Sequence, residues 1–287
     1  MTLWTELLDA RAGVIRGRHV TRVLEAGSGP GLLLLHGQGG SLENFRRNIP
    51  AYAEHAHVVA IDLQWHGRSG APPVDPELIP AWSSQVEEVV SNLGWTTYAI
   101  EGQSLGGWIA ARHAMDHPER VTALVLTTPM GLDPLGQGLD PAVRRRVLDA
   151  QLETLRALTP DAVRRRMEML FLSPEEVDDE IVELRRVIYA DPAVNVALAA
   201  VAQAYLGGHA TDRFRLGPGE LGRLAVPTLV YWGSANIGGD AAGKELAAAI
   251  PGARYHCAEA SHWAQYEKAD EHNRVVLEFL HEVDAIR

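Results

Sequence analysis

The strongest constraint on the fold is an alternation of short apolar, β-branched runs with longer amphipathic stretches. Six runs have the length and composition of strands, at residues 31–35, 57–61, 98–100, 122–126, 227–231 and 254–257. Between most of them lie stretches of helical periodicity, at 80–93, 105–117 and 240–250. Strands that alternate with helices predict an α/β fold with a mostly parallel sheet and helices on both faces. Ligands of such sheets bind outside the carboxyl ends of the strands.

The alternation stops in the middle of the chain, where four helices are predicted in succession without a strand. Each predicted start pairs a capping side chain with proline, at Asp140-Pro141, Thr159-Pro160, Ser173-Pro174 and Asp191-Pro192. The run from Ser173 to Glu176 also has the pattern of a capping box. We therefore expect a core of residues 1–132 and 222–287 and a helical cap of residues 133–221.

Two arginine clusters fall on the predicted cap helices, at residues 144–146 and 164–166. Runs of like charge on a helix are most often its solvated face. We therefore expect both clusters to point to solvent.

Charge and composition exclude several classes of function. The chain has 26 Lys and Arg against 37 Asp and Glu, a formal net charge of -11, which disfavours nucleic acid and anionic membranes as partners. No stretch has the roughly 18 consecutive apolar residues of a membrane span, and the N-terminus lacks the layout of a signal peptide. A single cysteine, Cys257, excludes an intrachain disulfide and a multi-cysteine zinc cluster. We expect a cytoplasmic protein without a metal.

The clearest chemical motif is the run GQSLGG at residues 102–107, which follows a predicted strand and opens a predicted helix. A G-x-S-x-G run in that position forms a nucleophile elbow, a strained turn that presents the serine hydroxyl at the carboxyl edge of the sheet. The sequence therefore predicts Ser104 as a nucleophile.

A serine nucleophile needs a base, because its hydroxyl reacts weakly at neutral pH. In this architecture the chain order is nucleophile, then acid, then histidine, so the base should follow the last strand. His262 has that position among twelve histidines. His256 and His272 are weaker candidates, because one falls within the last predicted strand and the other within the following helix.

The residue that orients His262 should follow the strand at 227–231. The expected position holds Asn236, whose amide oxygen can accept the imidazole N–H but carries no charge to stabilise imidazolium. Asp240, four residues later, and Asp133, after another strand, are the alternatives. A reaction that requires less base strength than ester hydrolysis would also explain the asparagine.

The run HGQGG at residues 36–40 follows the first strong strand and predicts one half of an oxyanion hole. We expect the backbone N–H groups of Gln38 and Leu105 to be the two donors, while Gly37 and Gly39 let the backbone approach the substrate. The run lacks a P-loop lysine, and no dinucleotide-binding glycine pattern occurs, so no nucleotide cofactor is implied.

These motifs, in this order, resemble those of the α/β-hydrolase superfamily over nearly the whole chain. Within it the chain is most similar to the meta-cleavage product hydrolases, which break a carbon–carbon bond in 2-hydroxy-6-oxo-dienoates. That narrower resemblance rests on the run HWAQYE from His262, the run TPMGL from Thr128 and the cap. The chain departs from the family at Asn236, where the family has aspartate, and at Gln38, where a small residue is usual.

The resemblance implies further substrate-binding residues. Asn44 matches a pocket asparagine, Phe171 and Arg185 match a cap aromatic and a cap arginine, and Trp263 matches a pocket tryptophan. A guanidinium in this place would grip a carboxylate through two hydrogen bonds. Arg186 is adjacent and could exchange with Arg185.

We therefore expect a capped hydrolase without a cofactor that acts on a small carbonyl substrate, with a dienoate-like compound as the first candidate. The alternatives are an ester or lactone hydrolase, another cofactor-independent catalyst, and a small-molecule receptor in which Asn236 marks a degenerate triad. The oligomeric state stays open, a homodimer being one option.

Overall fold

The computed structural model describes residues 2–207 and 211–286. The remaining residues, which fall within the predicted core and cap, lie outside this description. An eight-stranded sheet forms the centre of the molecule, in the order β1-β2-β4-β3-β5-β6-β7-β8. Its strands are β1 (Arg11–Arg16), β2 (Val20–Ala26), β3 (Gly31–Leu35), β4 (His57–Ile61), β5 (Tyr98–Gln103), β6 (Val121–Thr127), β7 (Thr228–Gly233) and β8 (Arg254–Ala258).

The strands from β4 to β8 in this order pair in parallel, whereas β2 pairs antiparallel with both of its neighbours, β1 and β4. All six predicted strands are present, and the predicted α/β class is confirmed. The antiparallel pair β1–β2 was not predicted. The residues of β1 are mostly exposed and include charged side chains, so this edge strand lacks the apolar signature of a buried strand.

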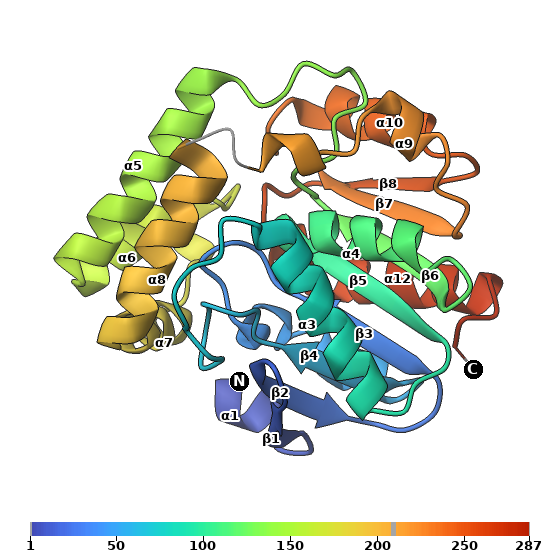
Figure 1. Cartoon of the computed structure of the whole chain (residues 1–287), viewed down its shortest axis with the longest axis horizontal. Coiled ribbons are helices and arrows are strands. Elements are labelled where there is room, and N and C mark those ends of the chain that lie inside the picture. Colours follow the sequence, from blue (N-terminus) through green and yellow to red (C-terminus); the bar gives the residue numbers. More distant parts are fainter. Residues whose placement is uncertain (1, 208–210, 287) are drawn as a thin grey trace.

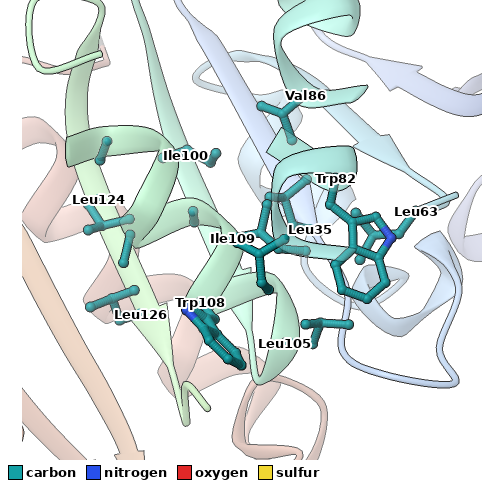
Figure 2. Close-up of a cluster of buried hydrophobic side chains, with 14 of the residues drawn as sticks. Leu35, Leu63, Trp82, Val86, Ile100, Leu105, Trp108, Ile109, Leu124 and Leu126 are labelled. Carbon is teal, nitrogen blue, oxygen red and sulfur yellow. The ribbon is translucent and has the colours of Figure 1, made fainter. Parts of the chain in front are cut away.

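Helices cover both faces of the sheet, with α3 and α4 in front and α12 behind in Figure 1. Alternate strand residues point to opposite faces, so that Leu33 and Leu35 join one buried cluster while Leu32 and Leu34 join the other. Figure 2 shows the first cluster, in which Trp82, Trp108 and Ile109 pack against the strands. The core helices are α1 (Leu3–Glu6), α2 (Ile49–Ala53), α3 (Leu78–Asn92), α4 (Leu105–Asp116), α9 (Pro218–Leu221), α10 (Gly239–Ala249), α11 (Ala264–Glu267) and α12 (Ala269–Glu282), with the 3₁₀ turn η1 (Leu42–Phe45).

Residues 133–207 and 211–214, which lie between β6 and β7 and which we call the cap, are largely helical and gather on one side of the sheet (Figure 1). Asp140, Thr159 and Asp191 cap its helices through side-chain hydrogen bonds, as predicted. Its helices and turns are α5 (Pro141–Ala157), α6 (Pro160–Glu168), η2 (Pro174–Glu176), α7 (Asp179–Tyr189), α8 (Pro192–Ala202), η3 (Gln203–Gly207) and η4 (Asp212–Phe214).

The helix start predicted at Ser173 is wrong. Pro174 opens only the three-residue turn η2, and the Ser173 side chain makes no capping hydrogen bond. The longer helix α7 begins five residues later, where the Asp178 carboxylate accepts from the Ile181 N–H. A carboxylate cap supports the positive end of a helix more strongly than a hydroxyl does, which favours the later start.

No single described helix is long and apolar enough to cross a membrane. One pair, Asp179–Tyr189 with Pro192–Gly207, meets the length and composition criteria only together, across a bend of 96°.

Candidate active site

Ser104 occupies the sharp turn between β5 and α4. Its backbone has φ 55° and ψ -114°, a conformation that residues other than glycine rarely adopt. Close backbone contacts explain the flanking glycines: a Cβ at Gly102 would lie 2.2 Å from the Gly106 carbonyl oxygen, and one at Gly106 would lie 2.1 Å from the Leu35 carbonyl oxygen. The structure therefore has the local geometry of a nucleophile elbow.

His262 lies beside Ser104 although 158 residues separate the two in sequence. Its Nε2 is 2.9 Å from the Ser104 Oγ, and its Nδ1 is 2.9 Å from the Asn236 Oδ1. An amide oxygen can only accept, so Nδ1 carries the proton and Nε2 is free to accept from the serine hydroxyl. The three side chains thus form a continuous hydrogen-bonded chain in the order Ser104, His262 and Asn236.

The two alternative orienting residues make other contacts. The Asp240 carboxylate accepts from the Tyr255 hydroxyl at 2.7 Å and pairs with Lys244 at 2.6 Å. The Asp133 carboxylate accepts from the backbone N–H groups at positions 137 and 138. Of the three candidates, the structure therefore favours Asn236.

The loop that carries His262 is held by residues to which the sequence analysis assigned no role. The His262 carbonyl oxygen accepts from Gln103 Nε2 at 3.0 Å and from Thr128 Oγ1 at 2.8 Å. On the cap side, the Leu170 carbonyl oxygen accepts from the backbone N–H groups of His262 and Trp263. Core and cap thus position the imidazole together. Gln103 stands directly before Ser104 in sequence, which is the one signal that could have drawn attention to it.

Burial and charge both act on the His262 imidazole. Desolvation and the positive charge of Arg166 lower its pKa to about 4. Asn236 supplies no negative charge that would oppose this shift. At neutral pH the imidazole is therefore neutral and able to accept a proton, although it is a weak base.

The two predicted oxyanion donors lie near this chain of side chains. Gln38 lines the same cavity as Ser104, and Leu105 begins α4 with its side chain buried in the core (Figure 2). Neither backbone N–H donates to another group in the described part of the chain. At Gly37 a Cβ would lie 2.4 Å from the Gln103 Oε1, so a larger residue there would displace the Gln103 side chain. Both donors are free to bind a developing negative charge.

A cavity of about 390 Å³ opens above Ser104, between the carboxyl ends of the strands and the cap. Its core side comes from loops after five strands, and its cap side is mostly apolar. The core residues are Gly37, Gln38, Asn44, Gln103, Ser104, Met130, Ala235, Asn236, Ile237, Ser261, His262 and Trp263. The cap residues are Leu139, Val143, Arg146, Val147, Arg166, Met169, Leu170, Tyr205 and Leu206.

Of the six predicted substrate-binding residues, Gly37, Asn44 and Trp263 line the cavity, whereas Gly39, Phe171 and Arg185 do not. Phe171 instead packs against the Trp263 ring, at 5.6 Å between ring centroids. The prediction that these last three residues face the substrate is therefore not met.

Arg185 is committed to protein contacts behind the cavity wall. Its guanidinium donates to the Gly39 carbonyl oxygen at 2.8 Å and to Asn44 Oδ1 at 3.0 Å, and it lies over the Trp263 ring. These contacts explain the error, because a guanidinium that α7 places against the glycine-rich loop finds acceptors in the protein itself. Arg185 thus anchors the cap to this loop.

Arg166 on α6 is the charged residue that the sequence analysis misplaced. It was expected on a solvated face, but it is 8% exposed and lines the cavity. Burial lowers the pKa of its guanidinium to about 10, which leaves it charged at neutral pH. Arg146 on α5 also lines the cavity and is exposed. Helical spacing alone did not reveal which arginine of each cluster turns inward.

Outside the cavity, one described group has atoms spaced for a metal ion, with Glu87 on α3 and His113 and His117 at the end of α4. The Glu87 carboxylate is already paired with Arg120 at 2.6 Å. None of the three lines the cavity, and the chemistry proposed below does not draw on them.

Comparison with known proteins places the chain in a family. A family model described as "alpha/beta hydrolase fold" matches residues 30–269. The chain is 28% identical over 300 residues to the 2-hydroxy-6-oxononadienedioate/2-hydroxy-6-oxononatrienedioate hydrolase of a Pseudomonas species, with 96% of each chain covered. It is 30% identical over 272 residues to the dihydrolipoyllysine-residue acetyltransferase component of the acetoin cleaving system of Cupriavidus necator, covering 93% of this chain and 67% of that protein.

Solved structures agree on the fold. The 2-hydroxy-6-oxo-6-phenylhexa-2,4-dienoate hydrolase of a Rhodococcus species superposes with a TM-score of 0.80 at 24% identity, over 94% of this chain and all of that one.

Proposed function

Because the chain belongs to the α/β-hydrolase fold family, we propose that it is a serine hydrolase that cleaves a bond next to a carbonyl group in a small substrate. The observation that carries this proposal is the 2.9 Å contact between Ser104 Oγ and His262 Nε2 at the cavity, beside two backbone N–H groups that donate to no described residue. We assign Ser104 as nucleophile, His262 as base, Asn236 as the residue that orients the base, and the N–H groups of Gln38 and Leu105 as oxyanion donors.

The substrate class is proposed from the relatives. Two similar proteins are named as hydrolases of 2-hydroxy-6-oxo-dienoate compounds, and the cavity suits a molecule of that size. In this reaction His262 assists transfer of the enol proton to carbon, giving the keto form. Ser104 or a water then attacks the carbonyl carbon, and its proton passes to His262. The carbon–carbon bond breaks, its electrons enter an enolate, and the enolate takes up a proton from the imidazolium. Attack by water releases the carboxylic acid directly, whereas attack by Ser104 leaves an acyl group on Oγ that a water activated by His262 then hydrolyses, with the proton returning to Ser104.

An ester or lactone would follow a second route through the same residues. Ser104 Oγ attacks the carbonyl carbon and its proton moves to His262 Nε2, while the oxyanion accepts from the N–H groups of Gln38 and Leu105. The leaving alkoxide takes the proton from the imidazolium. Water then attacks the acyl group with its proton passing to His262, and the acid is released.

A small-molecule receptor is the second candidate, because Asn236 and the low pKa of His262 both weaken the base. Such a protein would keep the cavity and lose turnover.

Turnover of a panel of dienoates and aryl esters by the purified chain separates the two functions. Hydrolysis that disappears in Ser104→Ala supports the hydrolase. Saturable binding of the same compounds without turnover, by wild type and Ser104→Ala alike, overturns it in favour of the receptor. The exposed Ser234→Ala serves as the matched control, since its side chain does not line the cavity.

A further inference from the structure

Three arginines of the described chain are less than 9% exposed, and they differ in the partners of their guanidinium groups. Arg46, 3% exposed, pairs with Glu6, Asp178 and Glu180. Arg185, 5% exposed, donates through Nη1 and Nη2 to oxygens of Gly39 and Asn44, as described above, while its Nε makes no hydrogen bond to any described residue. In each of these two arginines at least two guanidinium nitrogens thus contact acceptors in the protein.

Arg166 has no such acceptors. Its Nε and Nη1 are buried and make no hydrogen bond to any described residue. No aspartate or glutamate occurs among the residues that line the cavity, all of which are described. No carboxylate is among the charges that act on its pKa, which burial lowers. A buried charge without a partner destabilises a fold strongly, so it is retained where a ligand supplies the missing partner.

We propose that Arg166 is the anion-binding residue of the cavity and takes a carboxylate group of the substrate that Ser104 attacks. The planar guanidinium presents paired N–H donors that match the two oxygens of a carboxylate. This assignment rests on the proposed function for the identity of the anion, and it moves the carboxylate site from Arg185 to Arg166.

The cavity around Arg166 defines the rest of the substrate. Apolar side chains of the cap line the same cavity as the guanidinium, among them Val143, Val147 and Met169. The exposed Arg146 adds a second positive charge to the same wall. The preferred substrate is therefore an anion with an apolar body and a reactive carbonyl group, and a neutral ester of the same shape is expected to bind less tightly.

Direct binding tests this assignment without relying on turnover. The probes are 4-phenylbutyrate and its neutral amide, titrated by calorimetry into the full-length Ser104→Ala protein. We expect the carboxylate to bind roughly 10- to 100-fold more tightly than the amide, as a charge-assisted hydrogen-bonded pair allows. Adding Arg166→Met should abolish the difference, and Arg166→Lys should retain part of it.

Arg165→Met is the matched control, because Arg165 is the exposed neighbour on the same helix and does not line the cavity. It should leave the preference for the carboxylate unchanged. Equal binding of the two probes to the unsubstituted cavity, or a preference that survives Arg166→Met, overturns the proposal. Thermal unfolding checks the variants, and Arg166→Met is expected to melt no lower than its parent because it removes an unpaired buried charge.

The result also separates this inference from the proposed function. A preference for the carboxylate that depends on Arg166, in a protein without turnover of any compound, supports the anion site and contradicts the hydrolase. If turnover depends on Ser104 but the preference for the carboxylate does not depend on Arg166, the hydrolase is supported and the anion site is contradicted.

Discussion

The two walls of the cavity satisfy their polar groups in different ways. On the core side, Ser104, His262 and Asn236 are hydrogen-bonded to one another. On the cap side, Arg166 is buried with Nε and Nη1 unpaired, among apolar neighbours. The core thus presents three side chains that already contact one another, whereas the cap presents a buried guanidinium that is assigned above to an anionic group of the substrate. The predictions below test that difference, beginning with the core.

Removing the nucleophile should have the largest effect. We expect Ser104→Ala to lower kcat by at least ~10⁴-fold, because the remaining residues cannot replace an attacking hydroxyl. Steady-state turnover measures this, with circular dichroism to check the fold. A loss below tenfold would show that the core wall does not supply a serine nucleophile.

Breaking the contact between cap and core should act on stability. Arg185→Met leaves Asn44 Oδ1 without this donor and weakens the support of the Gly39 carbonyl oxygen, which still accepts from the Tyr189 hydroxyl. We expect the free energy of unfolding to fall by about 2–4 kcal/mol, as measured by urea denaturation.

Arg186→Met is the control for that measurement, since its side chain pairs with Glu183 near the surface, and such pairs contribute about 0–1 kcal/mol. An equal loss in both variants would contradict the structural role of Arg185.

Giving the base a charged partner should raise activity. Asn236→Asp places a carboxylate beside the His262 Nδ1–H, so we expect ester turnover at pH 7 to rise by at least ~10-fold. The carboxylate stabilises imidazolium and so raises the pKa of His262 above about 4. Because only the neutral imidazole accepts a proton, activity falls as the pH drops through that pKa. The acid limb of the profile of kcat/KM against pH should therefore move to higher pH.

Asn236→Ala should instead lower turnover, because nothing then holds the ring. If neither substitution changes turnover or the pH profile, Asn236 does not orient the base.

The smallest predicted effect concerns the electrostatic interaction between the cap wall and the core wall of the cavity. The Arg166 charge disfavours protonation of His262, so Arg166→Met should raise the pKa of the imidazole. With a neutral ester as substrate, the acid limb of kcat/KM should move slightly to higher pH. The other charged group that lines the cavity is Arg146, and the exposed Arg165→Met should leave the limb in place. An unmoved limb in Arg166→Met would indicate that the two walls are electrically independent.

The core was largely predictable because its signals are local. Six strands and the helices α4 and α10 fall within a few residues of their predicted positions. Apolar runs and glycine turns determine the conformation of short segments, so they can be recognised from the sequence. The pair β1–β2 was missed because its edge strand β1 is mostly exposed and has no such pattern. Ser104 and His262 were identified by their places after strands, and parallel strands bring those places to one edge.

The cap shows where local signals stop. The pattern that indicated a helix at Ser173 produced a short turn, because Asp178 offered a better cap further along. Both arginine clusters were predicted to face solvent, but the Arg166 side chain is buried and lines the cavity. Its neighbour Arg165 stays exposed, since residues one apart on a helix face different directions.

By itself, the sequence determined the α/β architecture, the elbow at Ser104 and the candidate base, because these depend on backbone conformation and on the order of strands. Only the tertiary structure decided that Asn236 rather than Asp240 or Asp133 contacts His262, and that Arg166 rather than Arg185 faces the cavity. For each of these two roles, the sequence offered more than one suitable residue. The packing of the cap against the strand ends selects among them, because it determines which side chains find partners within the protein and which are left to face the cavity.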